Sequence, residues 1–376
     1  MAQGTSRSAA PAPTVGPVVL SIDAMGGDRG PEAVLGGVGL AARAAPDLNF
    51  ILNGPEADLR RILGQHPGLA GRCVIRHAER VVVMTDKPSQ VLRHGEGTSM
   101  WGTIEAVRDG SAAVAVSCGN TGALMAMSMI RLRKLPGVNR PAIACLWPSR
   151  GAAGFNVMLD VGADVRADAP DLAQYALMGA AYARHGLGIA APRVGVLNVG
   201  TEDNKGRPEL RAALDLIAAS AAAGRFACAG FVEGTDIPSD RIDVIVTDGF
   251  TGNVALKTGE GTARLIRDFL RESFGASIWS RIAALLAMTS LRRLQRRIDP
   301  RRVNGGVFLG LNGTVVKSHG SADATGVAAA IDLAHRLARS DFQRGLVAQL
   351  AEAGVSGMSG VGAVPSAPVP RAGGAN

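Results

Sequence analysis

The chain has 376 residues, and 47% of them are hydrophobic, which predicts a globular protein with a sizeable core. Only 4% are aromatic and basic residues never form a long run, so the formal net charge of +8 does not indicate a nucleic-acid-binding surface. We therefore expect the partners to be small anions, an acidic protein or an anionic membrane surface, with no nucleic acid among them.

The four cysteines lack the spacing of a metal site or a CxxC motif, which indicates free thiols in a reducing compartment. Residues 1–17 and 351–376 are rich in Ala, Gly, Pro and Ser, and we expect both to be disordered tails. No run of 18 apolar residues predicts a membrane span. The prediction is a cytoplasmic protein with one folded domain over residues 18–345 and neither metal nor cofactor.

Short apolar runs rich in β-branched residues alternate with helical patterns along this domain. The expected strands include 18–23, 49–53, 73–77, 113–117, 155–161, 193–198 and 228–232. The expected helices include 31–45, 99–109, 171–184, 208–223 and 322–338. This alternation predicts a three-layer α/β/α fold around a mostly parallel, doubly wound sheet. Residues 140–144 and 155–161 should form a hairpin or adjacent edge strands, and Asn312-Gly313 predicts a second hairpin.

The stretch 113–126 is a strand, a glycine turn and a small-residue helix. The turn contains Gly119, Asn120, Thr121 and Gly122, and either Asn120 or Thr121 is a candidate helix cap. Free N–H groups at a helix start can bind an anion. The alternative is an ordinary strand–helix junction capped by glycine.

The stretch 243–257 repeats this pattern and adds a charge. Asp248 precedes the turn, Asn253 lies in it, and Lys257 follows one helical turn later. Because both loops follow strands of one sheet, we expect both to lie at carboxyl ends, where α/β proteins bind ligands.

Several other loops carry polar residues for which a binding role and a structural role both remain open. Asp23, Gly26 and Gly27 follow the first strand, and the structural role open to this segment is to form a turn and cap a helix. Lys87 and Lys205 lie in polar loops, as surface charges or as anion ligands. Asn312, Lys317 and His319 surround the predicted second hairpin.

The segment 275–300 is apolar in its first half and amphipathic in its second, with Arg292, Arg293, Arg296 and Arg297 on one face. One interpretation is a core or dimer-interface helix. The other is a helix that lies on anionic lipid.

The order and content of these motifs resemble one protein family. The matching sequences are DAMGGD at 23–28, DKPS at 86–89, GNTGALMA at 119–126, RPA at 140–142, DGFTGNVALKT at 248–258, LNG at 311–313 and KSHG at 317–320. The chain is similar to the PlsX family of bacterial phosphate acyltransferases over residues 18–338. It departs at Asp164, where the family usually has Asn, and at Cys118, where a small residue is usual, which argues against a catalytic thiol.

The resemblance implies a homodimeric cytoplasmic enzyme, loosely membrane-associated, with a fold of the isocitrate dehydrogenase and phosphotransacetylase type. It implies acyl phosphate formation from acyl carrier protein thioesters and inorganic phosphate, which feeds phosphatidic acid synthesis through a downstream glycerol-3-phosphate acyltransferase. We expect Asn120 and Thr121 to contact phosphate or the oxyanion, and Asn253 or Asn312 to donate to it. Lys205, Lys257 and Lys317 are the candidate charge partners. Asp23, Asp160 and Asp248 would orient lysines or handle a proton.

Three alternatives remain at this point. The acyl donor could be coenzyme A, as in a phosphotransacetylase. The chain could be a nicotinamide-dependent dehydrogenase, although it lacks a GxGxxG fingerprint. It could also be a non-catalytic lipid-surface scaffold.

Overall fold

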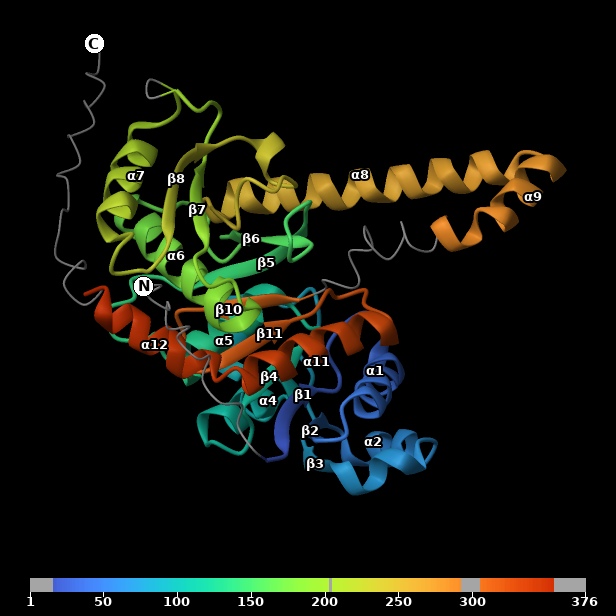
Figure 1. Cartoon of the computed structure of the whole chain (residues 1–376). Coiled ribbons are helices and arrows are strands. Elements are labelled where there is room, and N and C mark those ends of the chain that lie inside the picture. The colour runs from blue at the N-terminus through green and yellow to red at the C-terminus, as the bar shows by residue number, and fades with distance from the viewer. Residues whose placement is uncertain (1–15, 203–204, 292–304, 355–376) are drawn as a thin grey trace, which may run out of the picture.

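Eleven strands form a single sheet in the order β3-β2-β1-β4-β11-β10-β5-β6-β9-β7-β8. The computed structural model describes residues 16–202, 205–291 and 305–354 (Figure 1). Within these ranges the strands are β1 (Val18–Asp23), β2 (Leu48–Gly54), β3 (Cys73–His77), β4 (Val114–Ser117), β5 (Ala142–Pro148), β6 (Phe155–Leu159), β7 (Arg193–Leu197), β8 (Ala227–Val232), β9 (Val244–Val246), β10 (Gly306–Leu309) and β11 (Thr314–Lys317).

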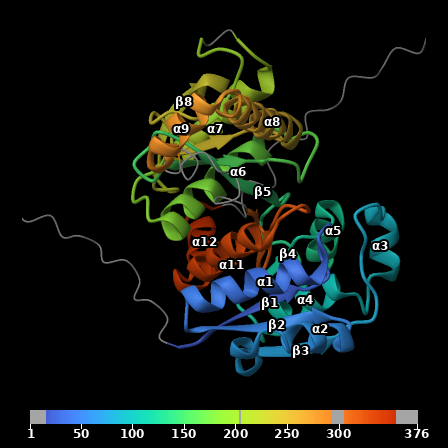
Figure 2. The same ribbon diagram turned by 90° about the vertical axis from the view of Figure 1, so that its right-hand side faces the viewer.

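Helices cover both faces of this sheet (Figures 1 and 2). They are α1 (Gly30–Ala44), α2 (Glu56–Leu63), α3 (Pro88–His94), α4 (Ser99–Arg108), α5 (Thr121–Arg131), α6 (Ala169–Ala181), α7 (Pro208–Ser220), α8 (Gly249–Gly275), α9 (Ile278–Leu286), α11 (Ala324–Arg339) and α12 (Phe342–Glu352). One hydrophobic cluster joins the sheet to α1, α6 and α11, and a second joins its other side to α4 and α5. The predicted three-layer α/β/α fold is confirmed.

The sheet reverses direction in its middle. Strand β10 is antiparallel to both β11 and β5, and β5 is antiparallel to β6. Both predicted hairpins are therefore present. Because of these three antiparallel pairs, the parallel block containing β4 runs opposite to the block containing β9. The two glycine loops still follow the carboxyl ends of strands. Because β4 and β9 run in opposite directions, however, these two carboxyl ends point in opposite directions along the strand axis.

Helix α8 packs unusually close to the turn at 160–164, and glycines make this possible. A Cβ atom built on Gly252 would lie 1.9 Å from the Asp160 carbonyl oxygen, and one on Gly249 would lie 2.0 Å from the Asp164 carbonyl oxygen. A Cβ on Gly259 would lie 2.3 Å from the Trp147 ring. The first half of α8 is thereby held against the sheet, over β5 and β6.

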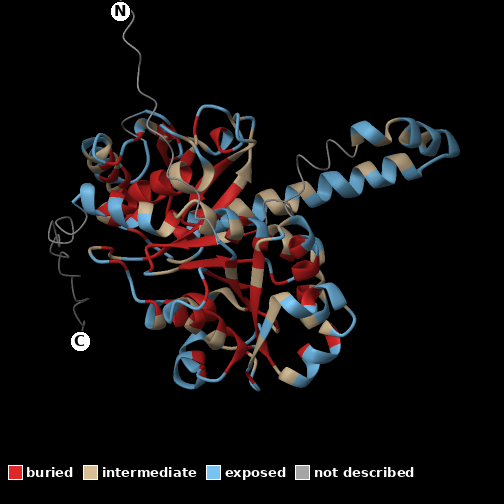
Figure 3. Cartoon of the chain, turned by 60° about the horizontal axis from the view of Figure 1, so that its bottom comes forward, coloured by how far each residue is buried: buried red, intermediate tan, exposed pale blue. Residues whose placement is uncertain are grey.

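The second half of α8 projects away from the sheet, and α9 folds back beside it (Figure 1). Exposed and intermediate residues dominate both segments (Figure 3). No residue of α9 is buried, and the side chains of Trp279 and Leu286 are 80% and 85% exposed. The interpretation of this segment as a core helix is therefore wrong. The four arginines at 292–297 lie outside the described residues, as do residues 1–15 of the predicted N-terminal tail.

The C-terminal boundary of the folded domain also differs from the prediction. Helix α12 continues to Glu352, beyond the predicted end at 345 and into the predicted tail. Phe342, Leu346 and Leu350 are all buried, and their four-residue spacing places them on one face of the helix. This apolar face provides the packing that orders the segment. In the described parts of the chain, no helix combines the length and the apolarity needed to cross a bilayer.

The close packing of α8 predicts opposite effects for two glycine-to-alanine changes on this helix. Gly252→Ala places a methyl group against backbone, and we expect a loss of roughly 1–3 kcal/mol in the free energy of unfolding. Gly261→Ala meets nothing within 4 Å, and the better helix propensity of alanine predicts a gain of up to about 1 kcal/mol. Urea denaturation of both variants measures this, and a Gly252→Ala protein as stable as wild type contradicts the packing account.

Candidate functional site

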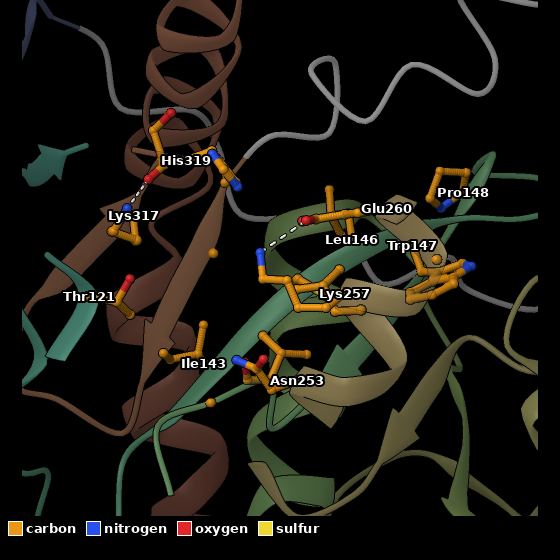
Figure 4. Close-up of a pocket in the computed structure, with 18 of the residues that line it drawn as sticks. Thr121, Ile143, Leu146, Trp147, Pro148, Asn253, Lys257, Glu260, Lys317 and His319 are labelled. Atoms are coloured by element: carbon orange, nitrogen blue, oxygen red, sulfur yellow. Dashed lines mark hydrogen bonds and ion pairs between the residues drawn. The ribbon is translucent and has the colours of Figure 1, made fainter. Parts of the chain in front are cut away.

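A cavity of about 440 Å³ lies between the first half of α8 and strand β5 (Figure 4). Helix α5 and the residues that follow β11 close its other side. It is lined by Thr121, Gly122, Ile143, Cys145, Leu146, Trp147, Pro148, Val161, Gly162, Asn253, Leu256, Lys257, Gly259, Glu260, Ala263, Gly305, Gly306, Lys317, Ser318 and His319. Six of these are predicted site residues, and they come from both glycine loops and the end of β11.

Lys317 is the most buried charged group of the cavity. It ends β11 and is only 9% exposed. Its Nζ donates to the carbonyl oxygens of Ser318 and, at 3.4 Å, of Cys118. Burial lowers the pKa of Lys317 to about 8, and the charge of Lys257 lowers it further, whereas the acids Asp23 and Asp28 oppose the shift. This ammonium lacks the compensation of a close carboxylate, so a bound anion stabilises it.

Lys257 enters the cavity from helix α8 (Figure 4). Its side chain is 52% exposed, and its Nζ lies 3.0 Å from Glu260 Oε2. One turn earlier, Asn253 Nδ2 donates to the Val161 carbonyl oxygen at 3.1 Å. The cavity is therefore lined by a partly exposed lysine, Lys257, and a buried lysine, Lys317. The carboxylate in the lining is that of Glu260, which pairs with Lys257 on α8.

His319 adds a third ionisable group to the rim. Burial lowers its pKa, and the positive charges of Lys257, Lys317 and Arg264 contribute in the same direction. Its Nδ1 accepts the backbone N–H of Ser321 at 3.2 Å, which assigns the proton of the neutral ring to Nε2. A neutral imidazole that donates from Nε2 is suited to hydrogen-bond an anion without competing for a proton.

The remaining wall of the cavity is apolar. Ile143, Cys145 and Trp147 alternate along β5 and point to the α8 side, where Leu256 lies opposite them. Burial raises the pKa of the Cys145 thiol to about 12, so this thiol is a poor nucleophile. The site thus combines a cationic end with an apolar wall, and this combination fits an anion and an acyl chain.

Asp23, Gly26 and Gly27 lie behind Lys317 rather than on the cavity wall. Burial raises the pKa of Asp23, although the Ser117 hydroxyl donates to its Oδ2 at 2.7 Å and Lys317 is close enough to oppose the shift. A Cβ on Gly26 would meet the Asp23 carboxylate and the Gly119 nitrogen. These glycines therefore allow three loops to meet, and the charge of Asp23 opposes the lowering of the Lys317 pKa.

The side chain of Asn120 is committed to local structure. Its Oδ1 accepts from the Ala123 N–H at 3.0 Å and caps α5, and its Nδ2 donates to the Met84 and Asp86 carbonyl oxygens. Thr121 and Gly122, at the first turn of α5, line the cavity instead. Lys87 is the exposed N-cap residue of α3 and is not part of the lining.

Four further predicted residues also lie outside the cavity lining. Asp248 caps α8 through Thr251 and pairs with Arg207. Asp160 accepts five hydrogen bonds from backbone N–H groups of Ile143 and the turn 162–164, so it holds that turn rather than a lysine.

Lys205 is exposed in the loop after β7. Asn312 lies in the hairpin turn before β11, whereas Lys317 ends this strand, about 10 Å from its first residue by strand geometry.

Sequence reasoning missed Trp147, Glu260 and the β5 wall. The signal was present in the alternation of Ile143, Cys145 and Trp147, and in the helical spacing that places Glu260 three residues after Lys257. Neither pattern identifies a cavity until α8 is known to cross β5. Within the described residues, no group of three His, Cys, Asp or Glu side chains has the arrangement of a metal site.

The fold has the three-layer α/β/α architecture that is also seen in solved phosphotransacetylases. A phosphotransacetylase from Streptococcus pyogenes superposes with a TM-score of 0.55 at 17% identity, covering 85% of this chain and 94% of that one. The EutD phosphotransacetylase from Staphylococcus aureus gives a TM-score of 0.53 at 16% identity over the same shares. At these identities the likeness concerns the fold alone.

The amino-acid sequence is similar to one protein family over most of its length. The "Fatty acid synthesis protein" family matches residues 18–344. A protein of Cereibacter sphaeroides (strain KD131 / KCTC 12085) named phosphate acyltransferase is 70% identical over 352 residues, which are 94% of this chain and 95% of that protein. A phosphate acyltransferase of Paracoccus denitrificans is 67% identical over 353 residues, with shares of 94% and 95%. The chain belongs to this family, the PlsX family, and is an enzyme.

The burial of Lys317 predicts a loss of stability whose size depends on pH. An unfolded lysine has a pKa of about 10.5, so below pH 8 the fold bears a cost of about 3 kcal/mol for the buried charge. Between pH 8 and 10.5 only the unfolded state binds this proton, and the cost falls as pH rises. We expect Lys317→Met to be more stable than wild type at pH 7 and to lose this advantage towards pH 10.

Urea unfolding of both proteins across this pH range, in phosphate-free buffer, tests the effect. The difference between variant and wild type removes the titration of groups that do not interact with Lys317. A difference that does not change with pH would show that Lys317 keeps an ordinary pKa.

Proposed function

We propose that the enzyme transfers an acyl group from the thioester of an acyl carrier protein to inorganic phosphate, with acyl phosphate as the product. One observation carries the proposal: Lys257 and Lys317 enter, from two different elements, a cavity whose β5 wall is apolar. The names of the relatives agree with acyl transfer to phosphate.

In the proposed reaction, a phosphate oxygen attacks the thioester carbonyl carbon. The new C–O bond forms as the C–S bond breaks, and the proton of the hydrogen phosphate dianion leaves on the carrier's thiol. Phosphate is itself the nucleophile, so no covalent enzyme intermediate is needed. The protein holds the dianion close to the carbonyl carbon and stabilises the oxyanion of the tetrahedral intermediate.

The residues of the cavity have distinct proposed roles. Lys257 and Lys317 bind the phosphate dianion as ammonium groups. The first-turn N–H groups of α5 and the Thr121 hydroxyl donate to the oxyanion. Asn253 keeps the turn after β6 in place through the Val161 carbonyl. The apolar β5 wall takes the acyl chain.

Product analysis tests this proposal. The protein is mixed with phosphate and either acyl carrier protein thioester or acyl-coenzyme A, and the products are separated after trapping with hydroxylamine. We expect phosphate-dependent acyl phosphate from the carrier protein substrate. Faster turnover of acyl-coenzyme A would favour a phosphotransacetylase instead, and the absence of any phosphate-dependent cleavage would leave the scaffold alternative.

Lys257→Ala should lower turnover without loss of the fold. A charged hydrogen bond to phosphate is worth roughly 1.5–3 kcal/mol, so we expect kcat/KM for phosphate to fall by about tenfold or more. Lys205→Ala is the matched control, because Lys205 is an exposed lysine outside the cavity lining. Unchanged kinetics in a folded Lys257→Ala protein remove Lys257 from the site.

We further propose that the enzyme works as a homodimer at the surface of anionic membranes, where its product passes to a glycerol-3-phosphate acyltransferase for phosphatidic acid synthesis. The apolar side chains of Leu265, Ile266 and Phe269 are about half exposed on the projecting half of α8, and a second copy can cover them. The exposed face of α9 supports contact with lipid.

Sedimentation with anionic vesicles tests the membrane proposal. We expect wild type to pellet with the vesicles, and a variant carrying Trp279→Ser and Leu286→Ser to pellet much less, because it loses apolar surface that would enter the lipid interface. Turnover of soluble carrier substrate should be retained. Equal pelleting of both proteins, or none by either, contradicts the proposal.

A further inference from the structure

Helix α8 carries a row of basic side chains that begins in the cavity and continues along the projecting half of the helix. Lys257, Arg264 and Arg271 follow one another at intervals of seven residues, and all three are exposed. Seven residues are close to two helical turns, so these side chains lie on one face. We name these three residues the α8 basic row.

The row is continuous with the site. Lys257 lines the cavity, and Arg264 is close enough to His319 at the rim for its charge to lower the pKa of that histidine. Lys257 pairs with Glu260. In the described portion of the chain, no carboxylate lies within ion-pair distance of Arg264 or Arg271, so both guanidinium groups are available to an acidic partner.

The apolar side chains of the projecting half lie on a different face. Leu265 follows Arg264 directly, which rotates it by about 100° around the helix axis. Phe269 lies four residues further, on the same apolar side as Leu265. A second copy that covers this apolar side therefore leaves the α8 basic row exposed.

From this arrangement we propose that the α8 basic row is the docking surface for the acidic face of the carrier protein that delivers the acyl thioester. The inference rests on the proposed function. A carrier aligned along the row places its thioester arm at the end where Lys257 and Lys317 lie. A membrane surface could also attract arginines, but it has no arm to insert at that end. Opposite charges on two proteins mainly raise the rate of encounter, and salt screens them.

The test compares two thioesters that share the reacting group. Acyl carrier protein needs the docking surface, whereas acyl-pantetheine carries the same thioester without the protein. For a variant with Arg264→Glu and Arg271→Glu, we expect KM for acyl carrier protein to rise about tenfold or more at low salt. The increase should shrink at high salt, and kcat/KM for acyl-pantetheine should remain at the wild-type value.

A second double variant provides the matched control. Arg43→Glu with Arg211→Glu changes the net charge equally, at exposed positions on α1 and α7. We expect wild-type kinetics with both thioesters. If this control variant raises KM for acyl carrier protein equally, the effect comes from net charge, and the inference that the carrier docks on the α8 basic row is wrong.

Other outcomes also overturn the inference. Equal losses with both thioesters would show damage to the cavity, and no change in KM would show that the carrier docks elsewhere. Loss of vesicle pelleting with an unchanged KM would assign the row to lipid. Failure of the proposed function is distinguishable, because wild type would then form acyl phosphate from neither thioester.

Discussion

The site depends on the close approach of helix α8 to the turn that follows β6. Gly249 and Gly252 have no Cβ, so the backbone of the helix packs against the carbonyl oxygens of Asp164 and Asp160. The Asp160 carboxylate fixes the same turn by accepting backbone N–H groups. Lys257 reaches the cavity on α8, and Lys317 reaches it from the end of β11.

The second constraint is electrostatic. Lys317 is buried and close to the charge of Lys257, and both effects lower its pKa and disfavour its charged form. In the proposed function, a phosphate dianion held by the two lysines would compensate both charges. Groups whose pKa is strongly shifted by burial are common at functional sites.

Much of the fold could be predicted from the sequence because its signals are local. The NG turn, the alternation of strands and helices and the apolar runs indicate both hairpins and the α/β/α layers. The reversal of the sheet could not be predicted, because it depends on long-range pairing of β10 with β5. Of the residues that line the cavity, Lys257, Lys317, Thr121 and Asn253 could be predicted as neighbours of a ligand-binding loop from their sequence context. Asn312 forms a turn and Asn120 caps a helix. The sequence could not separate these structural roles from ligand binding, because asparagine is common in turns, at helix caps and in binding loops.

The most direct test is the pKa of Lys317 with and without phosphate. It can be followed by NMR on lysine side chains labelled with ¹³C, with the signal assigned by its loss in Lys317→Arg. We predict a pKa of about 8 in phosphate-free buffer and a clear rise on saturation with phosphate, because the bound dianion favours the ammonium. A pKa that does not change with phosphate would mean that phosphate binds elsewhere, and it would contradict this account of the cavity.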